Sequence, residues 1–318
     1  MIWLSWRQQR TETVITAALL ALLAALLVPE ALHLASLYDR DGIARCLDHQ
    51  SIACKQTLSD FSGHAGILRS LMPWFTLLPG VIGVAVAAPI LLDLESGTFR
   101  LAWTQSVTRG RWIATRFSLA VLTALAAGGV LALLFGWYRA PLDKVFGSFD
   151  STSFDLEGTV SLGYVLFAVG LALAIGVAWR RTAPAVVVAF LAYVASRLFV
   201  DGWLRQRFVT PLSATWGFNA RGPNLDRAWV LWSGPSDRAG HPFNQGFAAV
   251  QACARTAGNG VKGLDPQCMA RHGAGYNHAV WQPASRFWEF QGIETALFGG
   301  VALLLLAFAA WWLRRRTA

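Results

Sequence analysis

The sequence is poor in charged side chains, which make up 14% of its 318 residues, whereas 55% of the residues are hydrophobic. A soluble domain usually carries about 25% charged residues. This shortage excludes a water-soluble globule of this size, because too little polar surface would remain to cover it. Charge is also absent locally, and uncharged apolar residues gather in six runs, at 14–28, 73–92, 117–138, 158–179, 182–196 and 295–313.

Several motifs of catalysis and nucleotide binding are absent as well. No GxxxxGK[ST] phosphate loop occurs, so the chain does not bind ATP in the Walker manner. Neither HExxH nor GxSxG occurs, and the apolar runs contain no nucleophile beside a His, Asp or Lys partner, which disfavours an intramembrane enzyme. Acidic residues are nearly missing from the middle of the runs, which disfavours an ion-coupled carrier. We therefore predict neither a catalytic site nor a cofactor in this chain.

The six runs are long enough to cross a membrane, which takes about 20 apolar residues. The first run extends to about residue 37 and the fifth to about residue 203, and tryptophans lie at the ends of most runs, as expected at headgroup level. The alternative for the first run is a signal peptide, but no clean cleavage site follows it. The pattern predicts an all-α integral membrane protein, a single transmembrane domain over 1–318, with spans at about 13–37, 73–92, 116–138, 158–179, 182–203 and 292–313.

Basic residues in the short connections predict the orientation. One side carries eleven Lys and Arg residues against three acidic ones, and the other side carries six against eight. The first side is predicted to be cytoplasmic, so both termini and the segment 93–115 face the cytoplasm of a bacterial plasma membrane, and 204–290 forms an extracytoplasmic cap. Residues 1–10 predict an interfacial helix before span one, or a plain basic lead-in. Topology and lipid phosphates account for the arginines, so no nucleic-acid partner is expected.

The four cysteines all fall in predicted outside connections. Thiols confined to the oxidising side suggest disulfides, and four cysteines allow three pairings. The rival interpretation is a metal site made by Cys253, Cys268, His272 and His278, but the loose spacing and the oxidising location favour disulfides. We predict the two pairings within single connections, Cys46–Cys54 and Cys253–Cys268.

Few ionisable residues lie inside the predicted spans, and such residues are functional hypotheses by default. Glu30, Arg197 and Glu294 are therefore candidates for a translocation path. Arg197 and Asp201 are four residues apart, which predicts an ion pair on one helix face. Glu30 and Glu294 lie near the outer ends of their spans, so headgroup water is the alternative for both.

The long segment 204–290 has no room for a catalytic domain with its own large core. Within it, Phe243, Phe247, Val250 and Ala254 recur at helical spacing. This spacing predicts an amphipathic helix over 243–256.

The connection between spans two and three is the most distinctive stretch. Gly97 is expected to end the helix that leaves span two, and apolar and polar residues interleave over 99–108. The pattern is typical of a short amphipathic element at the membrane surface. Either this element docks a soluble partner, or Trp103 and Trp112 simply anchor it in the interface.

The motif Glu95-x-Gly97-Thr98, followed by the residues 100–109, resembles the permease subunits of type-2 ABC exporters, especially the actinobacterial group. Two further matches lie at 6–10 and 282–294. The resemblance implies an interfacial amino-terminal helix, six spans, a coupling helix between spans two and three, and two permeases (a second copy or a paralogue) on two separate ATPase subunits that bind ATP and Mg. Carried over by position, the ATPase-coupling residues are Glu95, Gly97, Thr98, Arg100, Trp103, Thr104, Gln105, Ser106 and Arg109.

These observations predict the membrane permease subunit of an ATP-driven exporter, which is a transporter subunit rather than an enzyme. The alternative is a membrane-embedded sensor or anchor whose outer segment binds a ligand without transport. An uncharged interior suits lipophilic drugs, lipids or amphipathic peptides, and the sequence does not choose among them.

Overall fold

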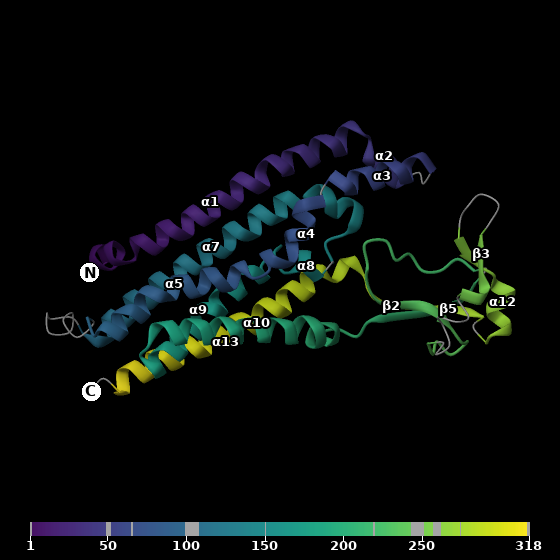
Figure 1. The fold of residues 1–318 in the computed structure, drawn as a ribbon. Helices are drawn as coiled ribbons and strands as arrows, with labels where there is room; N and C mark the ends of the chain where they lie inside the picture. Colours follow the sequence, from purple (N-terminus) through teal and green to yellow (C-terminus); the bar gives the residue numbers. More distant parts are fainter. Residues whose placement is uncertain are drawn as a thin grey trace. The chain divides into compact units, whose positions relative to one another are not determined.

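A computed structural model describes most of the chain in two compact units, Met1–Arg205 with Trp288–Ala318 (the helical unit) and Gln206–Phe287 (the strand unit) (Figure 1). Every strand within the described residues lies in the strand unit. The described residues are 2–48, 52–64, 66–98, 108–149, 151–218, 220–242, 251–256, 262–273 and 275–316.

Six helices are long and apolar enough to cross a membrane, which confirms the predicted fold class. Both chain termini lie at one end of the helical unit (Figure 1), which we call the terminal end, and the other end is the opposite end. The six helices are α1 (Ile2–Arg40), α5 (Leu78–Ser96), α7 (Arg109–Phe146), α9 (Val160–Trp179), α10 (Thr182–Phe199) and α13 (Phe287–Arg316). Helix α10 continues as the π-helix η1 (Val200–Leu204) and the 3-10 helix η2 (Arg205–Arg207).

The helix boundaries depart from the predicted ones in three places. The expected interfacial helix is not a separate element, because residues 2–40 form one uninterrupted helix. Span two starts near residue 78 rather than 73, because the chain turns at Thr76 and Leu77 before Pro79 opens α5. Helix α7 already begins at Arg109, where the Thr108 side chain accepts a hydrogen bond from the Arg111 backbone.

Short helices occupy much of the first two connections at the opposite end. The first outside connection contains three short helices, and the Cys46–Cys54 disulfide joins two of them, as predicted. These helices of the opposite end are α2 (Ile43–Asp48), α3 (Ile52–His64), α4 (Gly66–Phe75) and, in the next connection, α8 (Ser151–Phe154).

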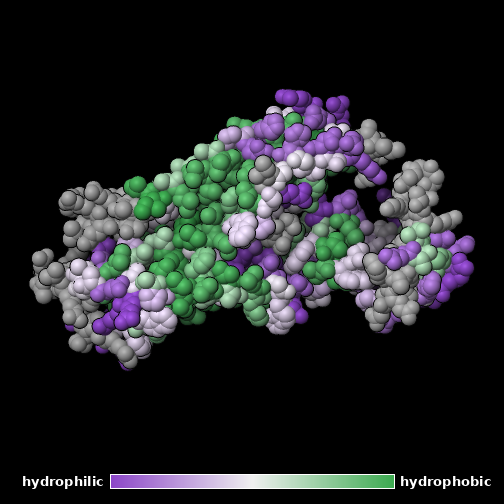
Figure 2. All heavy atoms as spheres, in the orientation of Figure 1, coloured by the Kyte–Doolittle hydropathy of each residue, from purple (hydrophilic) through white to green (hydrophobic). Residues whose placement is uncertain are grey.

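Helix α9 is the most buried of the six and lies at the centre of the bundle. Small residues let its neighbours approach closely: a Cβ added to Gly83 of α5 would lie 2.5 Å from the Cβ of Ala168, and one added to Gly128 of α7 would lie 2.9 Å from the Cα of Leu162. This is how helices pack in lipid, where van der Waals contact replaces the hydrophobic drive. Hydrophobic side chains cover the middle of the helical unit (Figure 2).

The strand unit is built on a three-stranded antiparallel sheet in the order β1-β5-β2, which the sequence reading did not predict. The expected helix over 243–256 is wrong at its end, because residues 254–256 pair as a strand, while 243–250 lie outside the described residues. The bounds are β1 (Leu212–Gly217), β2 (Trp229–Ser236), β3 (Ala254–Thr256), β4 (Lys262–Leu264), α12 (Pro266–Arg271), β5 (Tyr276–Gln282) and η3 (Ala284–Arg286).

The predicted Cys253–Cys268 disulfide is present. The ligand atoms of these two cysteines and of His272 lie within 4.8 Å of one another. His278, the remaining member of the rival metal site, instead lies on β5 with its Nδ1 atom 2.7 Å from the hydroxyl of Thr215. The structure therefore favours the disulfide over the four-ligand metal site.

Candidate functional site

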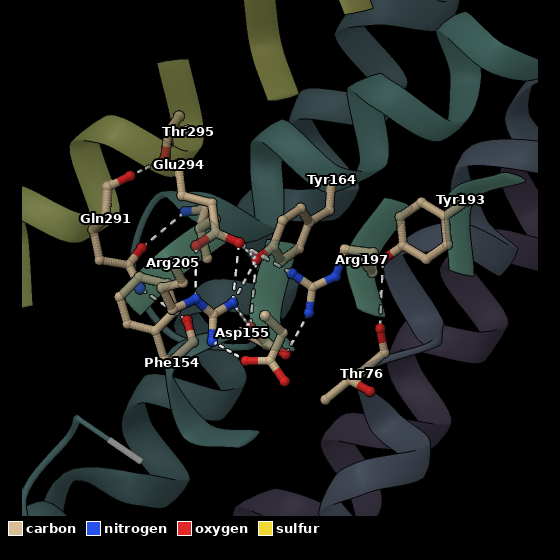
Figure 3. Close-up of polar contacts among 12 residues, drawn as sticks. Thr76, Phe154, Asp155, Tyr164, Tyr193, Arg197, Arg205, Gln291, Glu294 and Thr295 are labelled. Carbon is tan, nitrogen blue, oxygen red and sulfur yellow. Dashed lines mark hydrogen bonds and ion pairs between the residues drawn. The ribbon is translucent and has the colours of Figure 1, made fainter. Parts of the chain in front are cut away.

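Five charged or polar side chains point toward one another inside the helical unit at its opposite end (Figure 3). Each comes from a different segment, and all five are buried. We call this group the buried ion cluster. Its members are Asp155 from the connection after α8, Tyr164 from α9, Arg197 from α10, Arg205 from η2 and Glu294 from α13.

The carboxylate of Glu294 is the centre of the cluster. The Tyr164 hydroxyl donates to its Oε1 at 2.5 Å, and Arg205 donates from Nε to Oε2 at 2.8 Å and from Nη2 to Oε1 at 3.0 Å. Arg197 adds an Nη1 contact to Oε1 at 3.3 Å. Glu294 is 0% exposed, so the alternative that it reaches headgroup water does not hold. Its charge is held by protein donors, as a buried carboxylate requires.

The two arginines share the second buried carboxylate, that of Asp155. Arg205 Nη2 donates to Oδ1 at 2.6 Å, and Arg197 Nη2 donates to Oδ2. Asp201 accepts from Arg205 Nη1 at 2.5 Å. The predicted pair of Arg197 with Asp201 is therefore wrong, because Arg197 donates from Nη1 to Glu294 and from Nη2 to Asp155 instead.

Aromatic rings cover the two guanidinium groups. The Cζ atom of Arg197 lies 3.7 Å from the ring centroid of Tyr164, and that of Arg205 lies 4.4 Å from the centroid of Phe154. Such cation–π contacts strengthen when the cation is desolvated. The cluster therefore joins α9, α10 and α13 through both charge and ring contacts.

Gln291 positions the connection that carries Asp155. Its Nε2 donates to the carbonyl oxygen of Phe154 at 2.8 Å, and its Oε1 accepts from the backbone N–H of Val160 at 2.9 Å. Between these points Gly158 has φ +66, and a Cβ there would lie 2.7 Å from the Gln291 Oε1. The fully buried Gln291 thus fixes the backbone on both sides of Asp155.

A second acidic group lies nearby in sequence. Arg139 donates to Glu157 at 3.1 Å and to Asp143 at 2.9 Å, so one arginine serves two carboxylates. Burial, reinforced by the charge of Asp143, raises the pKa of Glu157 to about 9. At neutral pH this carboxyl therefore holds a proton beside Arg139.

At the terminal end, three spans meet around the start of the connection between α5 and α7. The Glu95 carboxylate accepts from the backbone N–H of Thr182, the first residue of α10, at 2.9 Å. Asp93 binds Arg116 of α7 at 2.6 Å and accepts from the Thr98 hydroxyl at 3.2 Å. A carboxylate at a helix N-terminus satisfies a free backbone donor and favours the helix dipole.

The predicted coupling residues divide into two groups. Glu95, Gly97, Thr98 and Arg109 lie where the helices end and begin, and Gly97 has φ 71, which glycine adopts readily at a helix end. The others lie outside the described residues, and these are Arg100, Trp103, Thr104, Gln105 and Ser106.

The candidate path residues are not all brought together. Arg197 and Glu294 share the buried ion cluster, whereas Glu30 is half-buried on α1 and is not a member. Sequence reasoning missed Asp155, Tyr164 and Arg205. The available signal was the charge of Asp155 and Arg205 just beyond the ends of predicted spans. Both residues fall in predicted connections, where charged side chains are expected, so this signal does not stand out.

A bundle of six spans, tied at both ends by polar contacts between spans, defines a multi-pass membrane protein. The family described as ABC-2 membrane transporter related matches residues 17–205, more than half of the chain, and the chain belongs to this family. It is thus a permease-type membrane subunit, and membership implies association with an ABC ATPase in general. No curated protein and no solved structure matches the chain.

Proposed function

We propose that this chain is the permease subunit of an ATP-driven exporter of the actinobacterial type-2 ABC group. In this proposal the terminal end faces the cytoplasm, and two permeases, either two copies or this chain and a paralogue, rest on two ATPase subunits. The connection between α5 and α7 receives the movement of the ATPase. Family membership supports the permease role, and the contacts at the terminal end support the site of coupling.

The observation that carries the coupling assignment is the bond from Thr182 to Glu95. It joins the last turn of α5 to the first residue of α10 at 2.9 Å, although 87 residues separate them in sequence. The ion pair of Asp93 with Arg116 joins the same turn to α7. A displacement of the connection would therefore act on three spans together.

Helix α10 then offers a route to the opposite end. It is a single helix from Thr182 to Phe199, so its two ends move together. Near its far end Arg197 enters the buried ion cluster. We infer that ATP-driven movement at Glu95 alters the surroundings of Arg197, where the translocation path would open.

The test is reconstitution of the chain with its ATPase in proteoliposomes. ATP hydrolysis and ATP-dependent flux are measured with rhodamine 6G, a fluorescent phosphatidylcholine and the neutral dye Nile red. Glu95→Ala should reduce flux about tenfold or more, because it removes a charge-assisted bond, while insertion stays normal. Glu289→Ala, an exposed glutamate at the other end of the bundle, is the matched control and should keep full flux.

Two results would contradict the proposal. ATP-dependent flux of Glu95→Ala at the level of the unmodified chain would remove the coupling assignment. Binding of a probe by the chain without ATP-driven flux of any probe would favour the sensor or anchor, which is the alternative function.

A further inference from the structure

A cavity of about 230 Å³ opens beside the buried ion cluster, wholly within the helical unit. Asp155, Tyr193, Arg197 and Asp201 form its polar wall, and residues that include Leu77 and Val194 form its apolar wall. From this cavity we infer that the chain binds an amphiphile whose head carries a protonated amine with an oxygen acceptor next to it. The inference deepens the proposed function, on which it rests, by naming a substrate class.

The charge around the cavity favours a cation. The ionisable side chains that contact one another here are two arginines and three carboxylates. Arg197 and Arg205 each pair with both Asp155 and Glu294, so two positive charges balance two negative ones. The charge of Asp201, which pairs with Arg205 as well, is left in excess. One unit of negative charge therefore remains next to the cavity, and a protonated amine would neutralise it.

One oxygen is free to accept that amine. Asp201 binds Arg205 through Oδ1, and no donor within the described part of the chain contacts its Oδ2. Its side chain is 36% exposed, compared with 7% for Asp155 and 0% for Glu294. Asp201 is thus the carboxylate that a ligand can reach.

A buried donor on the same wall lacks an acceptor. The Nε atom of Arg197 has no hydrogen-bond partner among the described residues, although Arg197 is only 7% exposed. Beside it, the Tyr193 hydroxyl makes a long contact, 3.4 Å, to the carbonyl oxygen of Thr76. A buried donor without a partner is costly, and an oxygen atom next to the amine of the ligand would satisfy it.

The remaining wall suits a hydrocarbon chain. Leu77, Val194 and Leu198 line the cavity together with Pro73. Leu198 is 68% exposed on the outer face of α10, where a lipid chain would lie. A head with an amine and an oxygen occurs both in free long-chain amino alcohols and in phosphoethanolamine lipids, so the source is part of the test.

Binding is measured on the purified full chain in detergent, without the ATPase. The probe is tritiated sphinganine, which has an amine beside a hydroxyl group, and saturable binding is read by scintillation proximity. N-acetylsphinganine keeps the chain and the hydroxyl groups but has no charge. We expect saturable binding of sphinganine and at least about tenfold weaker binding of the acetylated compound, since a charge-assisted contact is lost.

Two pairs of variants assign the binding to the cavity. Asp201→Asn keeps an acceptor for Arg205 but removes the excess charge, so sphinganine affinity should fall about tenfold or more, and the exposed Asp237→Asn should leave it unchanged. Val194→Trp fills the apolar wall and should abolish binding. Ala195→Trp, the next residue on the exposed face of α10, should retain it.

Unchanged affinity in Asp201→Asn, or equal binding of the acetylated compound, would overturn the inference. Competition by lysophosphatidylethanolamine would support a lipid headgroup as the natural ligand, and its failure to compete would support a free amphiphile. Because this assay needs no ATP, lost coupling in the flux experiment leaves its outcome unaffected, and the two proposals can fail separately.

Discussion

Replacing Arg205 by methionine tests how the buried ion cluster stabilises the bundle. Arg205 is 1% exposed and donates to Glu294, Asp155 and Asp201. Its loss leaves one arginine for three carboxylates, of which two are almost fully buried. Breaking a buried ion pair from one side costs about 3–5 kcal/mol. Since two buried carboxylates, Glu294 and Asp155, each lose a charged donor at once, we expect the cost of Arg205→Met to lie at the upper end of this range.

The double variant Arg205→Met/Glu294→Met separates charge from packing. It removes one positive and one negative side chain, so the remaining members of the buried ion cluster keep the net charge of the unmodified cluster, and Asp201 beside them is unchanged. Replacing a complete buried pair by apolar side chains is often close to neutral. The double variant should therefore lose less free energy of unfolding than Arg205→Met and Glu294→Met lose in sum, by about 2 kcal/mol or more.

The assay is unfolding of the purified chain by sodium dodecyl sulfate in mixed micelles, followed by far-ultraviolet circular dichroism. Arg111→Met, an exposed arginine on α7 whose side chain makes no ion pair within the described residues, should change stability by less than about 0.5 kcal/mol. Two results would refute the view that the arginines neutralise buried carboxylates in the cluster. One is a loss of less than about 1 kcal/mol in the free energy of unfolding for Arg205→Met, and the other is strict additivity in the double variant.

Three further predictions concern other parts of the molecule. The pKa of Glu157 is raised from its ordinary value of 4.5 to about 9, so between these two pH values the folded chain binds one more proton than the unfolded chain. Thermal stability should therefore fall as pH rises from 6 to 9, and Glu157→Gln should flatten this dependence. Replacing Cys253 and Cys268 by serine should destabilise the strand unit by about 3 kcal/mol, measured by proteolysis, since the loop spans 15 residues. Gly83→Leu should reduce the yield of folded protein in fluorescence-detected size exclusion, because even a Cβ there would meet the backbone of α9, whereas leucine at the open position Gly129 should not.

The six spans could be predicted because bilayer thickness sets a length that the apolar runs display directly. The disulfides could be predicted because both join cysteines that are close in sequence. The sheet could not, since its strands pair residues as distant as Leu212 and Trp281, and such pairing depends on partners that a local pattern does not show.

The buried ion cluster was only half predicted, for a similar reason. Arg197 and Glu294 stood out because charge is rare inside an apolar run. Their partner Asp155 lies in a connection whose own sequence is polar and predicts solvent exposure. In the structure Gln291 of α13 holds the backbone on both sides of Asp155, and Asp155 is buried. The local spacing instead pointed to Asp201 as the partner of Arg197, and tertiary contacts overrode it.

The arrangement of charge gives the two ends of α10 different properties. At Thr182 the helix is held by one exposed bond to Glu95, which water can replace at little cost. At Arg197 the helix is held by buried ion pairs to Asp155 and Glu294, which water cannot easily replace. A displacement passed to α10 through the first contact would therefore meet its main resistance at the second. The excess charge at Asp201 lies one turn beyond Arg197, so a ligand that neutralises it would further stabilise the end that already resists movement, and its release would require the ATPase to act through the weaker contact.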